Sequence, residues 1–332
     1  MKSPVNSVNI SIIRTISGCF MDNCLFDCAV CTDVGVRGDL NEDNYCINGL
    51  TLPSDKLSSR HSEKSSDMPE VVAAVFDGAG GLGVGELASA ACAKLMAKNG
   101  RKLLHGNELA VIEYVKSANS RLCALSSEKH AHATSTMTLL TAGGNRARIH
   151  NLGDGSAFLY HSGKLKRLTR AREPVSSGQN SRYGRSGLSA CRGGDPDVSR
   201  LEAVESCEAE LVPGDCLLLC SDGLNSLSEE RLSALFEKGG NAETLSRDLV
   251  TAAVQQGSRD NITALVVKVR ESWEFSKARK RAGQGGEASG KSIPKSKPGN
   301  KGLGSLRGEM EGTGLYMLLA LVLGALISVI SR

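Results

Sequence analysis

Three predominantly apolar runs in this sequence each have an aspartate at or near one end, and this arrangement constrains the fold more than any other feature. The pairs are Val71–Phe76 with Asp77, Leu217–Cys220 with Asp222, and Ile262–Val269 with Asp260. Apolar runs of this length are typical of buried strands. An acid at the end of a buried strand must reach water, a positive partner or a metal ion, because an unpaired buried charge is costly. The sequence therefore predicts strand ends at which several acids need such a partner.

Helical patterns alternate with clusters of strand-like segments. Four stretches have helical periodicity or helix-start signals, namely 86–98, 108–125, 228–237 and 242–255, and shorter strand-like pieces lie at 135–141, 147–152 and 157–161. This order predicts an α+β sandwich with the helices packed outside the strands. Residues 50–69 are polar and lack periodicity, so we expect a loop there between two strands.

Composition and charge narrow the class of protein. Of 332 residues, 40% are hydrophobic and 23% are charged, which is typical of a globular chain. Residues 275–332 carry ten Lys/Arg and three Asp/Glu, so with +4 for the whole chain the first 274 residues have a net charge of −3. This slightly acidic balance argues against a nucleic-acid partner for the folded part.

The cysteines allow two interpretations. Cys24, Cys28 and Cys31 form a cluster with metal-like spacing, but a structural zinc site needs four ligands in two clear pairs. The alternative is that Cys28 and Cys31 belong to a buried first strand, where a free thiol behaves as a small hydrophobic group. We expect the second arrangement.

Changes in composition divide the chain into four parts. These are an N-terminal extension at 1–25, a folded domain at 26–270, a basic flexible linker at 271–312 and an apolar segment at 313–331. The last segment has no charged residue, and as a helix its nineteen residues would span about 28 Å, close to the ~30 Å hydrocarbon core. We expect a single transmembrane helix there, and the basic linker predicts that the domain stays on the cytoplasmic side. The alternative, a buried core helix, would place a long tether before a core element.

Four acidic segments stand beside glycines or at strand ends. They are Asn41-Glu42-Asp43-Asn44, Asp77-Gly78, Ser221-Asp222-Gly223 and Asp260-Asn261. Converging carboxylates repel one another unless cations neutralise them, and oxygen ligands favour Mg²⁺ or Mn²⁺. Two such ions can lower the pKa of a water molecule between them, so that it attacks phosphorus. Taken singly, each aspartate could equally be a turn residue before glycine.

In their order along the chain, these motifs resemble those of the protein phosphatase 2C (PPM) family of metal-dependent serine/threonine phosphatases, in its bacterial form. The resemblance covers roughly residues 28–269 and includes Thr32-Asp33-Val34-Gly35, Asn41-Glu42-Asp43, Val75-Phe76-Asp77-Gly78-Ala79-Gly80-Gly81, Asn151-Leu152-Gly153-Asp154, Leu218-Leu219-Cys220-Ser221-Asp222-Gly223-Leu224 and Gly257-Ser258-Arg259-Asp260-Asn261-Ile262-Thr263. It implies a four-layer α-β-β-α sandwich around two Mg²⁺ or Mn²⁺ ions.

The resemblance also implies roles for single residues. Asp77 would bridge both ions, the Gly78 carbonyl would bind one, and Asp222 with Asp260 would bind the other. Glu42 and Asp43 would act through metal-bound waters, so that Asp43, Asp77, Asp222 and Asp260 form the catalytic set. Asp154 matches a position that some members use for a third, weaker metal, although a turn acid is an equal alternative.

The sequence departs from the family pattern near the substrate. An arginine often stands four residues before the glutamate of Asn41-Glu42-Asp43, but Gly38 is there and Arg37 lies one residue earlier. Arg37 would bind the substrate phosphate, since guanidinium suits that task, or it is a solvated loop residue. Ala79 replaces a common histidine or methionine, so leaving-group protonation would come from water.

The predicted function is hydrolysis of phosphoserine and phosphothreonine in proteins, at the inner membrane face. Its partners would be phosphorylated proteins, in particular a serine/threonine kinase or its substrates. Two alternatives remain open from sequence. One is a catalytically weak phosphoprotein-binding scaffold of the same fold, and the other is a regulatory phosphatase with a single dedicated partner.

Overall fold

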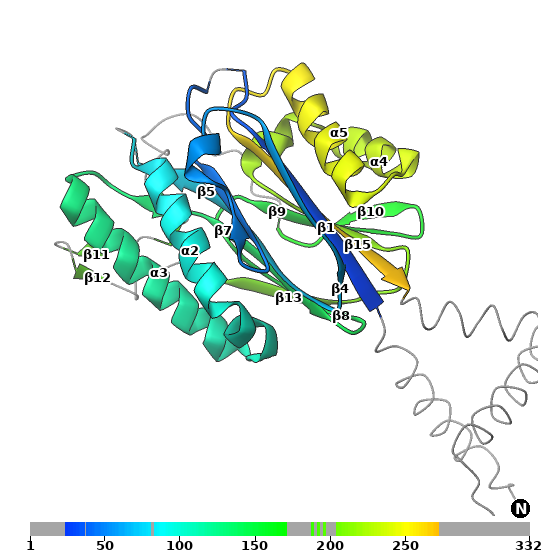
Figure 1. Cartoon of the computed structure of the whole chain (residues 1–332), viewed down its shortest axis with the longest axis horizontal. Coiled ribbons are helices and arrows are strands. Elements are labelled where there is room, and N and C mark those ends of the chain that lie inside the picture. The colour runs from blue at the N-terminus through cyan, green and yellow to red at the C-terminus, as the bar shows by residue number, and fades with distance from the viewer. Residues whose placement is uncertain are drawn as a thin grey trace, which may run out of the picture. The chain divides into compact units, whose positions relative to one another are not determined.

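Residues 24–36, 38–80, 83–170, 187–188, 191–192, 195–196 and 204–271 are described by the computed structural model. Two helix pairs and two large sheets make up this part of the chain (Figure 1). In chain order the elements are β1 (Cys24–Asp33), β2 (Asp43–Ile47), β3 (Leu50–Thr51), η1 (Ser54–Lys56), β4 (His61–Met68), β5 (Glu70–Ala79), α2 (Gly85–His105), α3 (Glu108–Lys129), β6 (Thr134–Ser135), β7 (Met137–Gly143), β8 (Arg146–Leu152), β9 (Ser156–His161), β10 (Lys164–Arg167), β11 (Cys191–Arg192), β12 (Asp195–Pro196), β13 (Glu205–Glu210), β14 (Cys216–Cys220), η3 (Asp222–Ser226), α4 (Glu229–Lys238), α5 (Ala242–Gln255) and β15 (Ile262–Glu271).

Both large sheets are antiparallel. One has the strand order β10-β9-β14-β15-β1-β4, and the other has the order β13-β8-β7-β5-β2-β3, with β6 pairing β5. The longest pairing joins β1 to β15, from Cys24 opposite Glu271 to Asp33 opposite Ile262. The first and last strands of the described domain are therefore neighbours in the interior of one sheet.

Alternation along each strand separates three apolar layers. In β5, Val71, Ala73 and Val75 face the space between the two sheets, together with side chains of β1, β14 and β15. Val72, Ala74 and Phe76 face the opposite way and pack against α2 and α3. The outer face of the other sheet packs in the same manner against α4 and α5.

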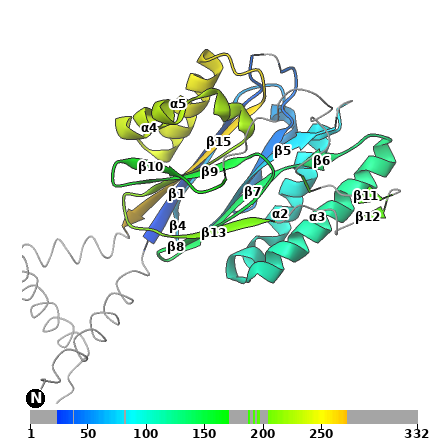
Figure 2. The same ribbon diagram turned by 180° about the vertical axis from the view of Figure 1, so that it is seen from behind.

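The resulting layer order is helices, sheet, sheet, helices, with α2 and α3 on one side and α4 and α5 on the other (Figures 1 and 2). Three of the helices begin with a side-chain cap: Asn107 accepts from the Leu109 amide, Ser228 from Arg231 and Asn241 from Thr244. The predicted α-β-β-α architecture is confirmed.

The prediction of a simple loop at 50–69 was wrong. This stretch contains β3, η1 and an eight-residue strand, β4, which pairs with β1. Because β4 lies at the edge of its sheet, many of its side chains reach solvent, and its polar composition gives no periodic signal. Lys64 and Glu63, for example, stand opposite Ala29 and Val30 of β1.

The cysteines of the first strand are separated by the alternation of β1. Cys28 lies in the layer between the sheets, whereas Cys31 packs on the α5 side. Both are free thiols, and burial raises the pKa of each. Side chains on opposite faces of a strand cannot share one metal ion, so the interpretation as a buried strand is confirmed over the zinc site.

The predicted membrane segment at 313–331 and the linker before it lie outside the described residues. Within the described part, no helix combines the length and the apolar character needed to span a bilayer.

Candidate metal centre

The predicted acids come together at one end of the two sheets. Asp43 begins β2 and stands directly opposite Asp77 of β5. Asp222 follows β14 as the first residue of η3, and Asp154 lies in the turn between β8 and β9. Oxygens of Asp77, Asp154 and Asp222 all lie within 4.8 Å of one another. Three acids that are far apart in sequence thus form a cluster of the size that a metal ion requires.

The carboxylates of this cluster affect one another's pKa values. Burial raises the pKa of Asp43 to about 7, and the charges of Asp222 and Asp260 add to the rise. Burial likewise raises the pKa of Asp77 far above its usual range, reinforced by the surrounding aspartates. Burial and the charges of Asp154 and Asp260 raise the pKa of Asp222 to about 7. Asp260 is exposed, but its charge reaches all three of these groups.

The donor set fits a hard divalent cation. Asp43 Oδ1 and Asp222 Oδ1 are buried, and within the described part of the chain neither oxygen has a hydrogen-bond partner. Among the same residues, no ion pair joins Asp43, Asp77 or Asp222 to a lysine or arginine. Buried carboxylate oxygens without a positive partner are costly, whereas Mg²⁺ and Mn²⁺ bind such oxygens well.

Two glycines allow the backbone at Glu42 to approach the cluster. The Gly78 amide donates to the Glu42 carbonyl at 3.1 Å, and a Cβ on Gly78 would lie 2.0 Å from the Gly85 carbonyl oxygen. A Cβ on Gly85 would lie 2.5 Å from the Glu42 carboxyl carbon. Any larger residue at either position would push Glu42 away, so the sequence Asp77-Gly78 has a steric as well as an acidic role.

The Asn261 side chain holds the loop that leads to Glu42. Its Oδ1 accepts from the Glu42 amide at 2.7 Å, and its Nδ2 donates to the carbonyls of Val34 and Leu40 at 3.1 and 3.2 Å. The loop is therefore fixed at both ends by one side chain next to Asp260. Arg37, the predicted phosphate ligand, belongs to this loop but lies outside the described residues.

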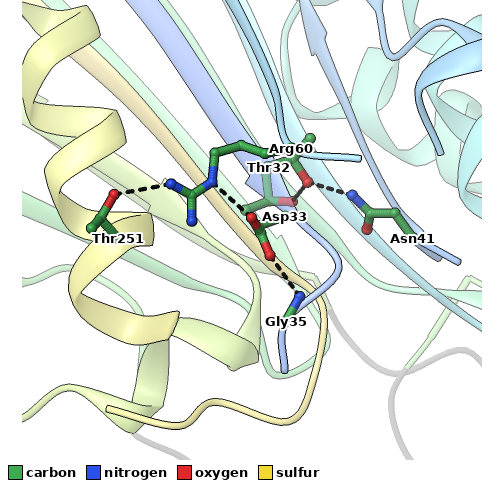
Figure 3. Close-up of polar contacts among 7 residues, drawn as sticks. Thr32, Asp33, Gly35, Asn41, Arg60 and Thr251 are labelled. Atoms are coloured by element: carbon green, nitrogen blue, oxygen red, sulfur yellow. Dashed lines mark hydrogen bonds and ion pairs between the residues drawn. The ribbon is translucent and has the colours of Figure 1, made fainter. Parts of the chain in front are cut away.

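A second set of contacts fixes the start of the same loop (Figure 3). Asp33 accepts from the Gly35 amide at 2.9 Å and from Arg60 Nε at 2.7 Å. Arg60 also donates to Thr251 of α5 at 3.2 Å. In the motif Thr32-Asp33-Val34-Gly35, Asp33 thus shapes the loop and does not join the acidic cluster.

Sequence reasoning missed several residues that act around the centre. Glu86, in the first turn of α2, lies near Glu42, and its charge adds to the rise that burial causes in the Glu42 pKa. Ser221 and Thr263 donate to Asp43 Oδ2, both at 2.7 Å. Both stand close to the acids in the sequence, but hydroxyl residues in or just after strands are too common to be singled out.

Comparison with known families agrees with this geometry. The family model described as Protein phosphatase 2C matches residues 54–256, which is more than half of the chain. The chain belongs to the protein phosphatase 2C family. The match includes Asp77, Asp154 and Asp222. Asp43 and Asp260 lie outside it. Asp43 stands opposite Asp77 in the pairing of β2 with β5, and the charge of Asp260 contributes to the raised pKa of Asp43.

Curated relatives in this family are distant and longer than the matched region. A probable protein phosphatase 2C 59 of Oryza sativa subsp. japonica is 27% identical over 216 residues, covering 59% of this chain and 66% of that protein. The serine/threonine protein phosphatase PstP of Mycobacterium tuberculosis is 28% identical over 213 residues, covering 59% of this chain and 40% of PstP. The chain thus spans 66% of the length of this rice relative and 51% of a second one, a probable protein phosphatase 2C 52.

Solved structures share the protein phosphatase 2C fold. The PstP catalytic domain in complex with two manganese ions has a TM-score of 0.58 and 21% identity, covering 75% of this chain and all of that one. PppA, described as a key regulatory component of T6SS in Pseudomonas aeruginosa, has a TM-score of 0.56 and 24% identity, covering 74% of this chain and all of PppA. At these identities the likeness establishes the fold.

Proposed function

We propose that this chain is a metal-dependent protein serine/threonine phosphatase that uses two Mg²⁺ or Mn²⁺ ions. The observation that carries the proposal is the cluster of Asp77, Asp154 and Asp222, whose oxygens lie within 4.8 Å of one another. The family match and the two manganese ions reported for the PstP domain support it. The substrates are phosphorylated proteins, the products of serine/threonine kinases.

The residues of the proposed metal centre have different roles. Four groups would hold the ions: Asp77, the Gly78 carbonyl, Asp222 and Asp260. Glu42 and Asp43 would act through water molecules that lie between them and the ions. Asp154 lies close enough to Asp77 and Asp222 to serve a third, weaker site. The bound ions supply a Lewis acid and lower the pKa of nearby water.

Among the described residues, one oxygen of Asp43 has no hydrogen-bond partner, so it can orient the attacking water. Its Oδ2 is occupied by two hydroxyl donors, so its buried Oδ1 can accept a proton from water. The water oxygen bonds to phosphorus as the bond from phosphorus to the serine or threonine oxygen breaks. Ala79 has no side-chain proton to give, so a solvent proton completes the leaving hydroxyl group. Arg37 remains our candidate for holding the phosphate.

The test is hydrolysis of a phosphothreonine peptide by the purified full chain, with Mn²⁺ and with a chelator. We expect metal-dependent turnover that falls by roughly 100-fold or more in Asp222→Asn, because one metal-binding carboxylate is lost. Asp248→Asn is the matched control, since this acid pairs with Lys238 on the helical surface at 2.7 Å. It makes the same charge change and should leave turnover intact.

Two results would contradict the proposal. Turnover that survives chelation would exclude the metal centre as its source. A chain that binds the phosphopeptide but never releases phosphate would instead favour the scaffold function. Within the described residues, one oxygen each of Asp43 and Asp222 lacks a hydrogen-bond partner. This argues against that alternative, because a pure binding surface gains nothing from repelling buried acids.

A membrane location completes the proposal. Residues 313–331 form an uncharged apolar stretch, and the segment before it is basic. As a transmembrane helix it would keep the catalytic domain at the cytoplasmic face, where membrane kinases and their substrates occur at raised local concentration. We expect the full chain to stay with membranes in carbonate and a chain ending at residue 312 to be released. Release of the full chain by carbonate would overturn the anchor and leave the enzymatic proposal unaffected.

A further inference from the structure

The two oxygens of Asp43 have different surroundings. Ser221 Oγ and Thr263 Oγ1 each lie 2.7 Å from Oδ2, while Oδ1 is buried and has no hydrogen-bond partner in the described part of the chain. Asp43 and Thr263 have no exposed surface, and Ser221 is 1% exposed. Without these contacts, rotation of the carboxyl group would exchange its two oxygens. The hydroxyl pair therefore determines which oxygen faces the metal centre.

The hydrogen bonds behind Asp43 have one consistent direction. An ionised carboxylate only accepts, so Ser221 and Thr263 must both donate their hydroxyl protons to Oδ2. Thr263 Oγ1 then accepts from Thr32 Oγ1 at 2.7 Å. Thr32 in turn accepts from Asn41 Nδ2 at 2.7 Å, and Figure 3 shows this contact. The chain of donors runs from Asn41 through Thr32 and Thr263 to Asp43.

Backbone groups close this network on both sides. The Thr263 amide donates to Ser221 Oγ at 2.9 Å, and the Asp43 amide donates to Asn41 Oδ1 at 3.0 Å. Asp43 belongs to one sheet, whereas Thr32 and Thr263 belong to the other, and Ser221 directly follows that sheet's strand β14. The network thus fastens the two sheets together at the end that holds the acids.

We propose that Ser221 and Thr263, with Thr32 behind them, are positioning residues that fix the Asp43 carboxylate for metal binding and hydrolysis. The inference rests on the proposed function, because Asp43 needs a defined orientation only if Oδ1 meets a metal ion or the attacking water. Partners behind metal-site residues orient them, and their loss typically costs 10–100-fold in affinity or activity. Nothing in this role requires the hydroxyl groups to touch substrate.

The decisive variant is Thr263→Val, which keeps the shape of the side chain and removes its hydroxyl group. In the full chain we expect kcat to fall by at least roughly 10-fold, and the Mn²⁺ dissociation constant measured by calorimetry to rise by about the same factor. The KM for the phosphothreonine peptide should stay within about twofold, since a positioning role leaves phosphate binding alone. Thr263→Ser restores the hydroxyl and should recover kcat and Mn²⁺ affinity to within about threefold of wild type.

Thr141→Val is the matched control. Thr141 is 3% exposed and stands opposite Val72, five residues from Asp77 along β5, or about 17 Å at the rise of a strand. The Thr141→Val variant tests whether replacing any buried threonine lowers kcat and Mn²⁺ affinity as Thr263→Val does. If Thr263→Val is folded and resembles Thr141→Val in both kcat and Mn²⁺ affinity, the positioning role is wrong. The role is equally wrong if Thr263→Ser fails to restore either quantity.

Thermal unfolding in the presence of chelator separates folding from positioning. If Thr263→Val does not fold, Ser221→Ala removes the other donor to Oδ2 and decides the question by the same two measurements. A wild-type chain that binds Mn²⁺ but hydrolyses no phosphopeptide would sink the proposed function. The calorimetric comparison would still support or overturn the positioning of Asp43.

Discussion

The space between the two sheets contains an apolar region and a polar region, although the same strands line both. Along β15 the inward row runs through Val269, Val267 and Leu265 and then reaches Thr263. Other strands change in the same way at the next position on the same face, two residues along the chain. The apolar and polar neighbours are Val30 and Thr32, Tyr45 and Asp43, Val75 and Asp77, and Leu219 and Ser221. The change occurs within one alternation step, at the same end of both sheets.

This contrast shows how a rigid core can carry repelling acids. Burial of the apolar rows holds the sheets together, because apolar surface is removed from water over their whole length. The last inward position of each strand then needs little packing of its own and can hold a carboxylate or hydroxyl group. Sites built on strands are held more accurately than sites on loops, so Asp43 on β2 and Asp77 on β5 keep their spacing despite repulsion.

The largest effect should come from Asp77→Asn in the polar region. We expect a loss of activity of roughly 1,000-fold or more, because Asp77 lies at the centre of the acidic cluster. In chelator the same variant should melt at or above the wild-type temperature, since one source of repulsion is gone. Peptide hydrolysis and thermal melts measure the two quantities. If Asp77→Asn keeps its activity, or melts below the wild-type temperature in chelator, the contrast between the polar and apolar regions is wrong.

In the apolar region, Leu265→Ala should show the opposite pattern. Leu265 is fully buried between the sheets, two residues from Thr263, and its truncation should cost about 2–5 kcal/mol of unfolding free energy. Well below the melting temperature, kcat should stay within about twofold of wild type, because the polar row is untouched. Urea unfolding with parallel kinetics tests this. A large fall in kcat in the folded state would mean that the two regions are not separable.

The pH dependence of the metal-free chain should expose the same repulsion. Asp43 and Asp222 have pKa values raised from 3.8 to about 7 in the folded state. The folded chain then binds more protons than the unfolded chain between these values, so stability falls as pH rises through this window. We expect the melting temperature in chelator to drop by about 5 °C or more between pH 5 and pH 8.

Saturating Mn²⁺ should flatten or reverse this dependence, because the bound ions stabilise the ionised carboxylates. Asp222→Asn should shrink the slope in chelator, as it removes one of the groups that titrate. A melting temperature in chelator that rises steadily from pH 5 to pH 8 would contradict the raised pKa values.

The smallest effect belongs to charges outside both regions. Lys64 of β4 pairs with Glu243 of α5 at 2.7 Å on the exposed face of the domain. Lys64→Ala should shift the melting temperature by no more than about 2 °C and leave kcat unchanged, because exposed ion pairs contribute little. A larger loss would show that this surface pair, and not burial alone, fastens α5 to the sheet.

Much of the fold follows from local sequence patterns. Val71–Phe76 and Leu217–Cys220 were recognisable because strands buried on both faces are continuously apolar. Strand β4 was not recognisable in the sequence, because an edge strand exposes polar side chains. Its structure depends on pairing with β1. The need of the strand-end acids for a metal ion or another partner could be predicted, because an unpaired buried charge is costly in any fold.

The hydroxyl groups behind the acids could not be predicted from sequence. Thr32 and Thr263 are ordinary strand residues, and only the register of β1 with β15 shows that they stand opposite each other. Glu86 is likewise a common first-turn residue until the close approach at Gly85 brings it near Glu42. Such contacts depend on pairings between distant segments, which local patterns do not encode.

The central claim is that these acids coexist because divalent cations bind among them. Calorimetric titration of the chelator-stripped full chain with Mn²⁺ tests it most directly, beside Asp77→Asn and the surface control Asp248→Asn. The account predicts two ions bound per wild-type chain, unchanged binding in the control, and loss of binding in Asp77→Asn. Wild-type protein that takes up no Mn²⁺, or binding that Asp77→Asn leaves intact, would contradict it.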